Sequence, residues 1–240
     1  MRFFLRHSLF LIGYSIFFCF LLTGCGVPGP DGPANSFYLD LTPPQTLPQK
    51  NPWGAIVFFV DGLNACVFED MLSTGELPAF KKYFVDRGLY APRAVANIPS
   101  VTLPNLTSIA TGRFCGHHGI MGINWLDRQT LLFRDYHTLE QKNMLNSDCK
   151  AEMLYQYFPD DFTVSIFYEP HRGASKFFED WLSAGPAFVF GWYYFVDRIT
   201  LFRFGEMMDI ARDRDQFPKL VFAYLLAPDY IAYQNGISNE

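Results

Sequence analysis

The sequence is poor in positive charge and lacks closely paired cysteines. Its 19 lysine and arginine residues face 24 aspartate and glutamate residues, so the formal net charge is −5 at pH 7. Proteins that bind nucleic acid depend on cationic contacts with phosphates, so this composition argues against nucleic acid as a partner. None of the five cysteines forms a Cys-x-x-Cys pair, which argues against a zinc site built from thiolates.

The chain nevertheless has ample material for a buried core. Half of its 240 residues are hydrophobic, and 26 of them are phenylalanine. This length suits one domain or slightly more. Nothing in the composition indicates disorder, and the sequence contains no internal repeat.

The N-terminal residues are typical of an export signal. Arg2 and Arg6 precede the uncharged apolar stretch 8–22, which is short for a membrane span and suits a signal peptide. Leu22-Thr-Gly-Cys25 resembles the bacterial lipobox, which implies cleavage before Cys25 and attachment of lipid to it. We therefore expect a lipid-anchored protein of the bacterial cell envelope, at the periplasmic or surface face of the outer membrane. An ordinary signal peptide or a membrane anchor is the alternative.

Three segments follow from this interpretation. Residues 1–24 form the signal peptide, residues 25–53 a tether rich in proline and glycine, and residues 54–240 the folded part. Removing residues 1–24 changes the net charge to 17 − 24 = −7. The folded part keeps three cysteines, and three thiols cannot all pair within one chain. They are Cys66, Cys115 and Cys149.

Apolar runs predict the strands of a mostly parallel sheet. Residues 55–60 and 220–226 are continuous apolar runs, as expected for strands buried on both faces. Residues 163–167 suit a further strand, and a short strand is expected over residues 89–96. Because helical patterns alternate with these runs, we predict an α/β fold with a mostly parallel sheet flanked by helices.

Two helices and one aromatic segment complete this organisation. Residues 77–87 have helical apolar spacing, with Gly88 placed to end the helix. A second helix is expected after Thr102, with a proline in its first turn and Gly112 at its end. Residues 187–196 are strongly aromatic and too short to span a bilayer, so we expect core or a cap over the site, with a membrane-contacting patch as the alternative.

Asp61 and Thr102 are the strongest candidate functional residues. Asp61 directly follows the run 55–60, and ligands of open α/β sheets bind at the carboxyl ends of strands. Thr102 begins a predicted helix, where the helix dipole is positive. A carboxylate and a hydroxyl so placed suit a metal ligand and a nucleophile for phosphoryl transfer. Alternatively, Asp61-Gly62 is a plain turn and Thr102 only caps its helix.

Several motifs in order resemble the type I phosphodiesterase/nucleotide pyrophosphatase family of the alkaline phosphatase superfamily. They are Val60-Asp-Gly-Leu63, Ser100-Val-Thr-Leu-Pro-Asn105, Ala110-Thr-Gly-Arg113, His117-His-Gly-Ile120 and Asn124. The resemblance implies an alkaline-phosphatase-like core and two divalent metal ions, zinc in this family. It assigns Asp61, Thr102 and Asp229 as metal ligands, Thr102 as the nucleophile, and Asn124 as a hydrogen-bond donor to the phosphoryl oxygen. His118 takes a structural place in this pattern, and Ser100 is the runner-up nucleophile.

The sequence departs from this family at its later motifs. Tyr233 stands four residues after Asp229, where the family has histidine, and neutral tyrosine is a poor zinc ligand. The later histidine ligands of the family have no counterpart before Glu240. We therefore expect the N-terminal portion of a longer enzyme, with a sheet that is incomplete at the C-terminus and leaves apolar edges exposed. Substitute ligands remain an alternative, with the candidates His117, His118, His137 and His171.

The resemblance implies metal-dependent hydrolysis of a phosphodiester or nucleotide pyrophosphate bond through Thr102. The substrate would be a small phosphate ester or nucleotide, and lipid on Cys25 would hold the protein at the bacterial membrane. We expect little activity from this chain alone. The alternative is a catalytically inactive, lipid-anchored binding or vestigial protein, which Tyr233 favours.

Overall fold

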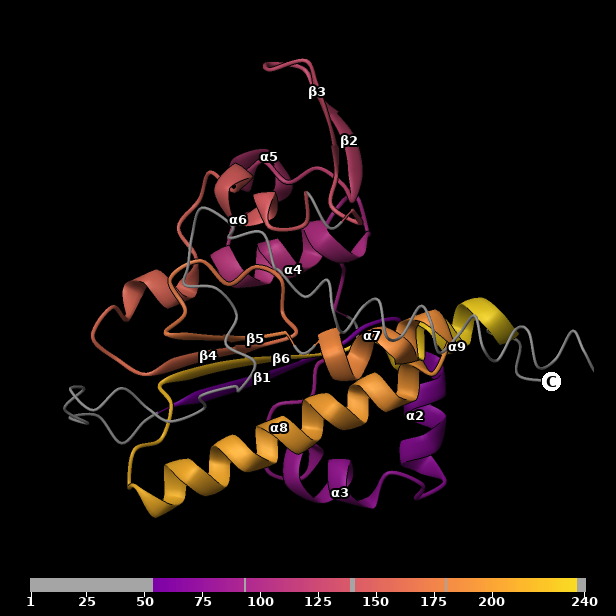
Figure 1. The fold of residues 1–240 in the computed structure, drawn as a ribbon. Helices are drawn as coiled ribbons and strands as arrows, with labels where there is room; N and C mark the ends of the chain where they lie inside the picture. The colour runs from indigo at the N-terminus through magenta and orange to yellow at the C-terminus, as the bar shows by residue number, and fades with distance from the viewer. Residues whose placement is uncertain (1–53, 93, 139–140, 180, 237–240) are drawn as a thin grey trace, which may run out of the picture. The chain divides into compact units, whose positions relative to one another are not determined.

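The computed structural model describes residues 54–92, 94–138, 141–179 and 181–236, all within the unit Leu41–Glu240 (Figure 1). The expected signal peptide, Cys25 and the whole of the expected tether lie outside these residues. No helix in the described part of the chain combines the length and the hydropathy that crossing a membrane requires.

A four-stranded parallel sheet forms the centre of the fold. Its strand order is β1-β6-β4-β5, and each neighbouring pair is parallel. The strands are β1 (Ala55–Val60), β6 (Leu220–Leu225), β4 (Thr163–Ile166) and β5 (Lys176–Phe178). The expected α/β fold with a mostly parallel sheet is therefore confirmed, and the apolar runs at β1, β4 and β6 form strands within one residue of their predicted ends.

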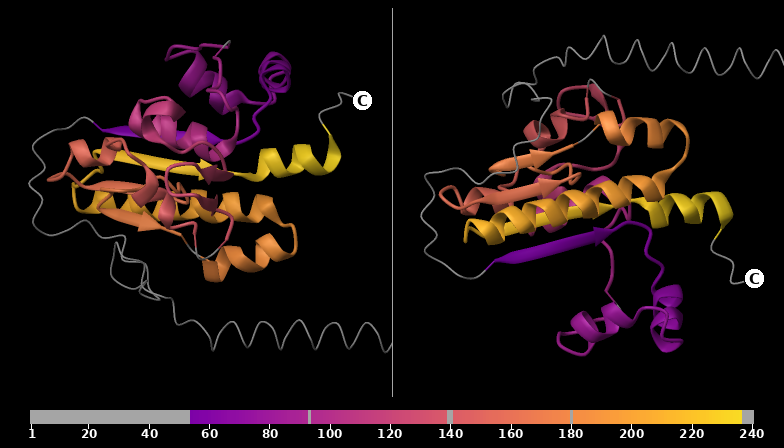
Figure 2. Two further views of the ribbon diagram at one scale, coloured as in Figure 1. Left: turned by 90° about the horizontal axis from the view of Figure 1, so that it is seen from above. Right: turned by 60° about the horizontal axis from the view of Figure 1, so that its bottom comes forward.

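Helices cover both faces of this sheet, as Figures 1 and 2 show. On one face α4 (Thr102–Thr111) packs Leu106 and Ala110 into a core that includes Phe222 of β6. On the other face lies α8 (Tyr193–Asp213). The ring of Phe204 on this helix packs against the ring of Phe58 on β1, with centroids 5.1 Å apart. The result is a three-layer arrangement in which the carboxyl ends of the parallel strands β1, β6 and β4 lie along one edge of the sheet.

Shorter elements surround these layers. The antiparallel hairpin of β2 (Asn124–Asp127) and β3 (Leu132–Asp135) forms a separate two-stranded sheet. The helices around the sheet are α2 (Ala65–Ser73), α3 (Pro78–Phe80), the π-helix η1 (Lys81–Val85), α5 (Cys115–His118), α6 (Met144–Asp148), the 3₁₀ helix η2 (Leu154–Tyr157), α7 (Trp181–Val189) and α9 (Ala227–Asn235).

Three local predictions were wrong in whole or in part. No strand forms within the described residues of 89–96, and Leu89 and Val95 are 97% and 94% exposed. The helix expected over 77–87 is divided into the short α3 and the π-helical η1. Residues 187–196 bury Ala187 and Val196 but expose most of the aromatic side chains between them. Over 89–96 and 187–196, many of the apolar residues that carried the pattern stay exposed.

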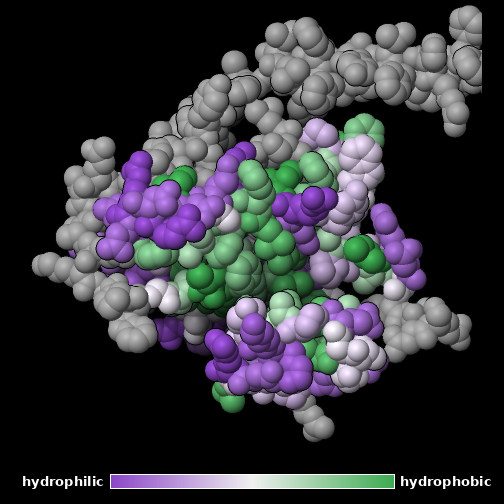
Figure 3. Space-filling view, turned by 90° about the horizontal axis from the view of Figure 1, so that it is seen from below, coloured by the Kyte–Doolittle hydropathy of each residue, from purple (hydrophilic) through white to green (hydrophobic). Residues whose placement is uncertain are grey.

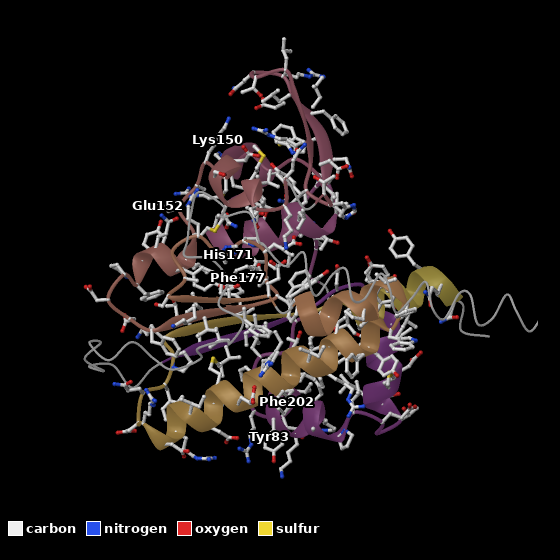
Figure 4. All side chains as sticks on the ribbon, viewed as in Figure 1. Tyr83, Lys150, Glu152, His171, Phe177 and Phe202 are labelled. Carbon is white, nitrogen blue, oxygen red and sulfur yellow. The ribbon has the colours of Figure 1, made fainter. Side chains whose placement is uncertain are left out.

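Apolar residues are also exposed beside β1. β1 lies at an edge of the sheet, and Ile56 is 44% exposed. Figure 3 shows hydrophobic side chains across the middle of the face seen from below, with hydrophilic groups on either side. Figure 4 labels Phe202 of α8 and Tyr83 of η1 in this lower region, and both are more than half exposed.

Candidate active site

Asp61 and Thr102 meet at the carboxyl edge of the sheet. Asp61 follows the last residue of β1, and its backbone N–H donates to the carbonyl of Leu225 at 2.8 Å, which holds it against the end of β6. Thr102 is the first residue of α4, and its Oγ1 donates to Oδ2 of Asp61 at 3.0 Å. The helix has no side-chain cap, so the Thr102 hydroxyl engages the carboxylate instead of capping the helix.

Tyr224 completes the hydrogen bonding of this carboxylate. Its hydroxyl donates to Oδ2 of Asp61 at 2.6 Å, and the Gly62 N–H donates to Oδ1 at 3.1 Å. The register of β1 with β6 pairs Phe59 with Tyr224, which brings the ring to Asp61. Burial raises the pKa of the Tyr224 hydroxyl, and the negative charge of Asp61 raises it further. Tyr224 is therefore a neutral donor, and the strand pattern 220–226 carried no signal of this contact.

Asp229 lies beside Asp61 in the first turn of α9. Burial raises the pKa of the Asp229 carboxyl, and the negative charge of Asp61 adds to the rise. The turn after β1 approaches α9 closely, because a Cβ on Gly62 would lie 2.4 Å from Cα of Asp229. The structure therefore brings together three of the predicted site residues, Asp61, Thr102 and Asp229.

Glu169 is a third carboxylate residue at this edge, after Asp61 and Asp229, and sequence reasoning missed it. It follows the end of β4, the third strand in the order β1-β6-β4. Burial raises the pKa of its carboxyl to about 7, and the charges of Glu179 and Asp61 add to the rise while Lys142 opposes it. The sequence did contain a signal for Glu169: like Asp61, it is an acidic residue that comes shortly after a predicted strand, here the one at 163–167.

Asn124 is not joined to this group. It is the first residue of β2, where it pairs with Asp135 and is exposed. Among the described residues, no hydrogen bond links its side chain to Asp61, Thr102 or Asp229. Its assigned role toward a phosphoryl oxygen stays a prediction.

The described histidines lie in other settings. His118 is fully buried, with Nε2 3.0 Å from the Ser108 hydroxyl and Nδ1 accepting from the Ile120 N–H, which fits its structural interpretation. His171 stacks on Phe177 with ring centroids 3.6 Å apart (Figure 4). His117 and His137 are exposed.

The residues at this edge do not fit two zinc ions. Zinc in proteins is usually held by four ligands drawn from cysteine, histidine and carboxylate. Asp61, Thr102 and Asp229 supply oxygen alone, and Oδ2 of Asp61 already accepts two hydrogen bonds. Across the described ranges, no group of three or more histidine, cysteine, aspartate or glutamate side chains is arranged to hold a metal ion.

The fold and the site together define an α/β protein whose polar side chains gather at the carboxyl edge of a parallel sheet, the ligand-binding edge of such folds. The chain belongs to the type I phosphodiesterase/nucleotide pyrophosphatase family, whose sequence model matches residues 55–240. Members of this family are metal-dependent in general.

The fold is similar to that of solved structures, among them one murine protein. Murine ectonucleotide pyrophosphatase/phosphodiesterase 5 matches with a TM-score of 0.55 and 14% sequence identity over 78% of this chain. The match spans 46% of the murine chain. It bears out the alkaline-phosphatase-like fold. No curated protein shows a significant sequence match.

Proposed function

We propose that the protein hydrolyses a phosphodiester or nucleotide pyrophosphate bond, with Thr102 as the nucleophile. The observation that supports this most directly is the 3.0 Å hydrogen bond from Oγ1 of Thr102 to Oδ2 of Asp61. It orients the hydroxyl and provides a carboxylate toward which its proton can move. A free threonine hydroxyl is a weak nucleophile and needs such activation.

The position of Thr102 also suits an anionic substrate. The first N–H groups of a helix have no intrahelical acceptors and carry partial positive charge. Thr102 begins the ten-residue helix α4, so a phosphate that approaches its hydroxyl also approaches this positive helix end. In the proposed reaction an Oγ1–phosphorus bond forms as the bond to the leaving oxygen breaks. Water then hydrolyses the phosphothreonine.

The proposal includes the finer expectations drawn from the family. The resemblance implies two divalent metal ions, zinc in this family, but the oxygen-only donors at this edge do not fit them. The proposed steps therefore use Thr102 and Asp61 and pass through no metal ion. The substrate would be a small phosphate ester or nucleotide. Cleavage before Cys25 and lipid on its thiol would anchor the protein in the bacterial cell envelope.

A catalytically inactive binding or vestigial protein is the second candidate. Tyr233 stands where the family has a metal-binding histidine, and its side chain is 82% exposed. An exposed phenol does not replace that ligand. This observation, with the oxygen-only donor set, favours loss of catalysis.

Hydrolysis of bis(p-nitrophenyl) phosphate by the full chain distinguishes these candidates. The assay is run with zinc, manganese or magnesium and compares wild type, Thr102→Ala and the matched control Ser100→Ala. Ser100 is exposed two residues away. We expect a low rate that Thr102→Ala abolishes and Ser100→Ala retains. Rates equal to the buffer rate in all three proteins would reject the hydrolase and leave the binding or vestigial candidate.

A further inference from the structure

An uncharged aromatic surface lies where α7 meets α8. We call it the aromatic corner. Its members are 43–82% exposed. They are Val189, Phe190, Trp192, Tyr194 and Phe195 at the junction of α7 and α8, and Ile231 and Tyr233 on α9.

Contacts between α8 and α9 make this a single surface. The ring of Tyr193 stacks on the ring of Tyr230, with centroids 3.7 Å apart. Asp197, in the first turn of α8, accepts from the N–H groups of Leu226 and Ala227 at 2.8 and 3.1 Å. The acid therefore points into the fold and caps α9, which leaves the corner without this negative charge.

The corner adjoins the candidate active site. α9 follows β6 and carries Asp229 in its first turn. Tyr230, the next residue, stacks on Tyr193, which lies between Trp192 and Tyr194 in the sequence. Figure 1 shows β6 leading into α9 at this end of the sheet, and α8 packs against both α7 and α9. A surface that binds at the corner would therefore lie beside the carboxyl edge of the sheet.

The composition of the corner suits a lipid surface. Tryptophan and tyrosine concentrate at membrane interfaces because their rings are apolar with one polar end. Residues 187–196 contain no charge and are too short to span a bilayer. The expected lipid site, Cys25, precedes β1 by fewer than 30 residues in the sequence. The bilayer is thus the apolar surface nearest to the fold.

We propose that the aromatic corner rests in the interface of a phospholipid bilayer and holds the carboxyl edge of the sheet beside it. The inference rests on the proposed membrane location, and it adds a second contact, made by the folded part itself. Because the corner is uncharged, its binding should be insensitive to salt and should not need anionic lipid.

Partitioning of the full chain onto neutral phosphatidylcholine vesicles tests this contact. Phe190 and Phe202 are both 61% exposed, but only Phe190 belongs to the corner. Phe190→Ser should lower the partition coefficient about tenfold, the equivalent of one buried phenylalanine. Phe202→Ser should change it less than about twofold. Equal effects of the two substitutions would overturn the proposal.

A second measurement reports the position of the corner independently of the amount bound. Vesicles with brominated acyl chains should quench the emission of Trp192, so wild type should lose emission that Trp192→Phe does not lose. Trp125→Phe, altered in β2, should behave as wild type. Quenching that is the same in all three proteins refutes the contact. The contact is also refuted if Trp192 is buried by self-association of the protein in the absence of vesicles. That result would assign the corner to an interface with a second copy of the chain.

The lipid anchor is tested separately. The Cys25→Ser chain should lose the lipid detected by mass spectrometry of protein isolated from membranes. If its vesicle binding still depends on Phe190, the corner contact stands whether or not the anchor exists. If neither protein binds vesicles, both the corner contact and the anchor are rejected.

Discussion

Gly62→Ala should destabilise the protein through the contact between the turn after β1 and α9. Gly62 has a φ of 63°, which costs a residue with a Cβ about 1–2 kcal/mol. The added Cβ would also lie 2.4 Å from Cα of Asp229. Since backbone cannot give way as a flexible side chain does, this overlap should cost about 1–3 kcal/mol more. We expect a total loss of about 2–5 kcal/mol in the free energy of unfolding.

Gly112→Ala is the matched control. Gly112 has a φ of 62°, and nothing lies within 4 Å of a Cβ built on it. Its substitution should cost only the conformational part, about 1–2 kcal/mol. Urea unfolding followed by circular dichroism, with linear extrapolation, measures both values. If the two substitutions cost the same, the turn does not pack against Asp229 and the assembly of the site described above is wrong.

Three further predictions concern the site and the thiols. Tyr224→Phe removes the 2.6 Å hydrogen bond to partly exposed Asp61 and should cost about 1–2 kcal/mol in urea unfolding. The pKa of Glu169, about 7 in the folded protein and 4.5 ordinarily, means that the folded state binds the proton more tightly. The contribution of Glu169 to the free energy of unfolding is therefore full below about pH 4.5 and is lost as the pH rises toward 7. Wild type should lose stability between pH 5 and pH 8, and Glu169→Gln should reduce this loss by at most about 3 kcal/mol. Cys66 is exposed and should react first with a maleimide among the three described thiols.

Each of these predictions has its own control. Tyr83→Phe alters an exposed phenol on η1 and should leave stability within about 0.5 kcal/mol; a similar loss in both tyrosine variants would contradict the contact with Asp61. Glu152→Gln alters an exposed carboxylate, labelled in Figure 4, and should keep the wild-type pH dependence. For the thiols, Cys66→Ser should remove the fast phase, because Cys115 and Cys149 are buried and burial raises their pKa. A fast phase that persists would show that a buried thiol is accessible.

The regular elements could be predicted where local sequence determines them. Six consecutive apolar residues at 55–60 form β1, and the start at Thr102 and end at Gly112 bound α4. These signals succeed because strand burial and helix ends depend on nearby residues. The predictions for 89–96 and 187–196 failed because they assumed that other elements would bury the apolar side chains of these segments. Whether another element covers an apolar side chain is a long-range property that a short pattern does not contain.

The fold class, the family and the candidates Asp61, Thr102 and Asp229 could be read from the amino-acid sequence, because ordered motifs and strand-end positions are local features. Which side chains meet depends on the packing of strands and helices. This packing joins Tyr224 to Asp61 across 163 positions through the register of β1 with β6, and it places Glu169 at the same edge. Within the described chain, Asn124 makes no hydrogen bond with the site residues. The aromatic corner is exposed, which the sequence pattern did not predict. The physical reason is that strand order and helix packing bring distant residues within hydrogen-bonding distance, and no local pattern records that order.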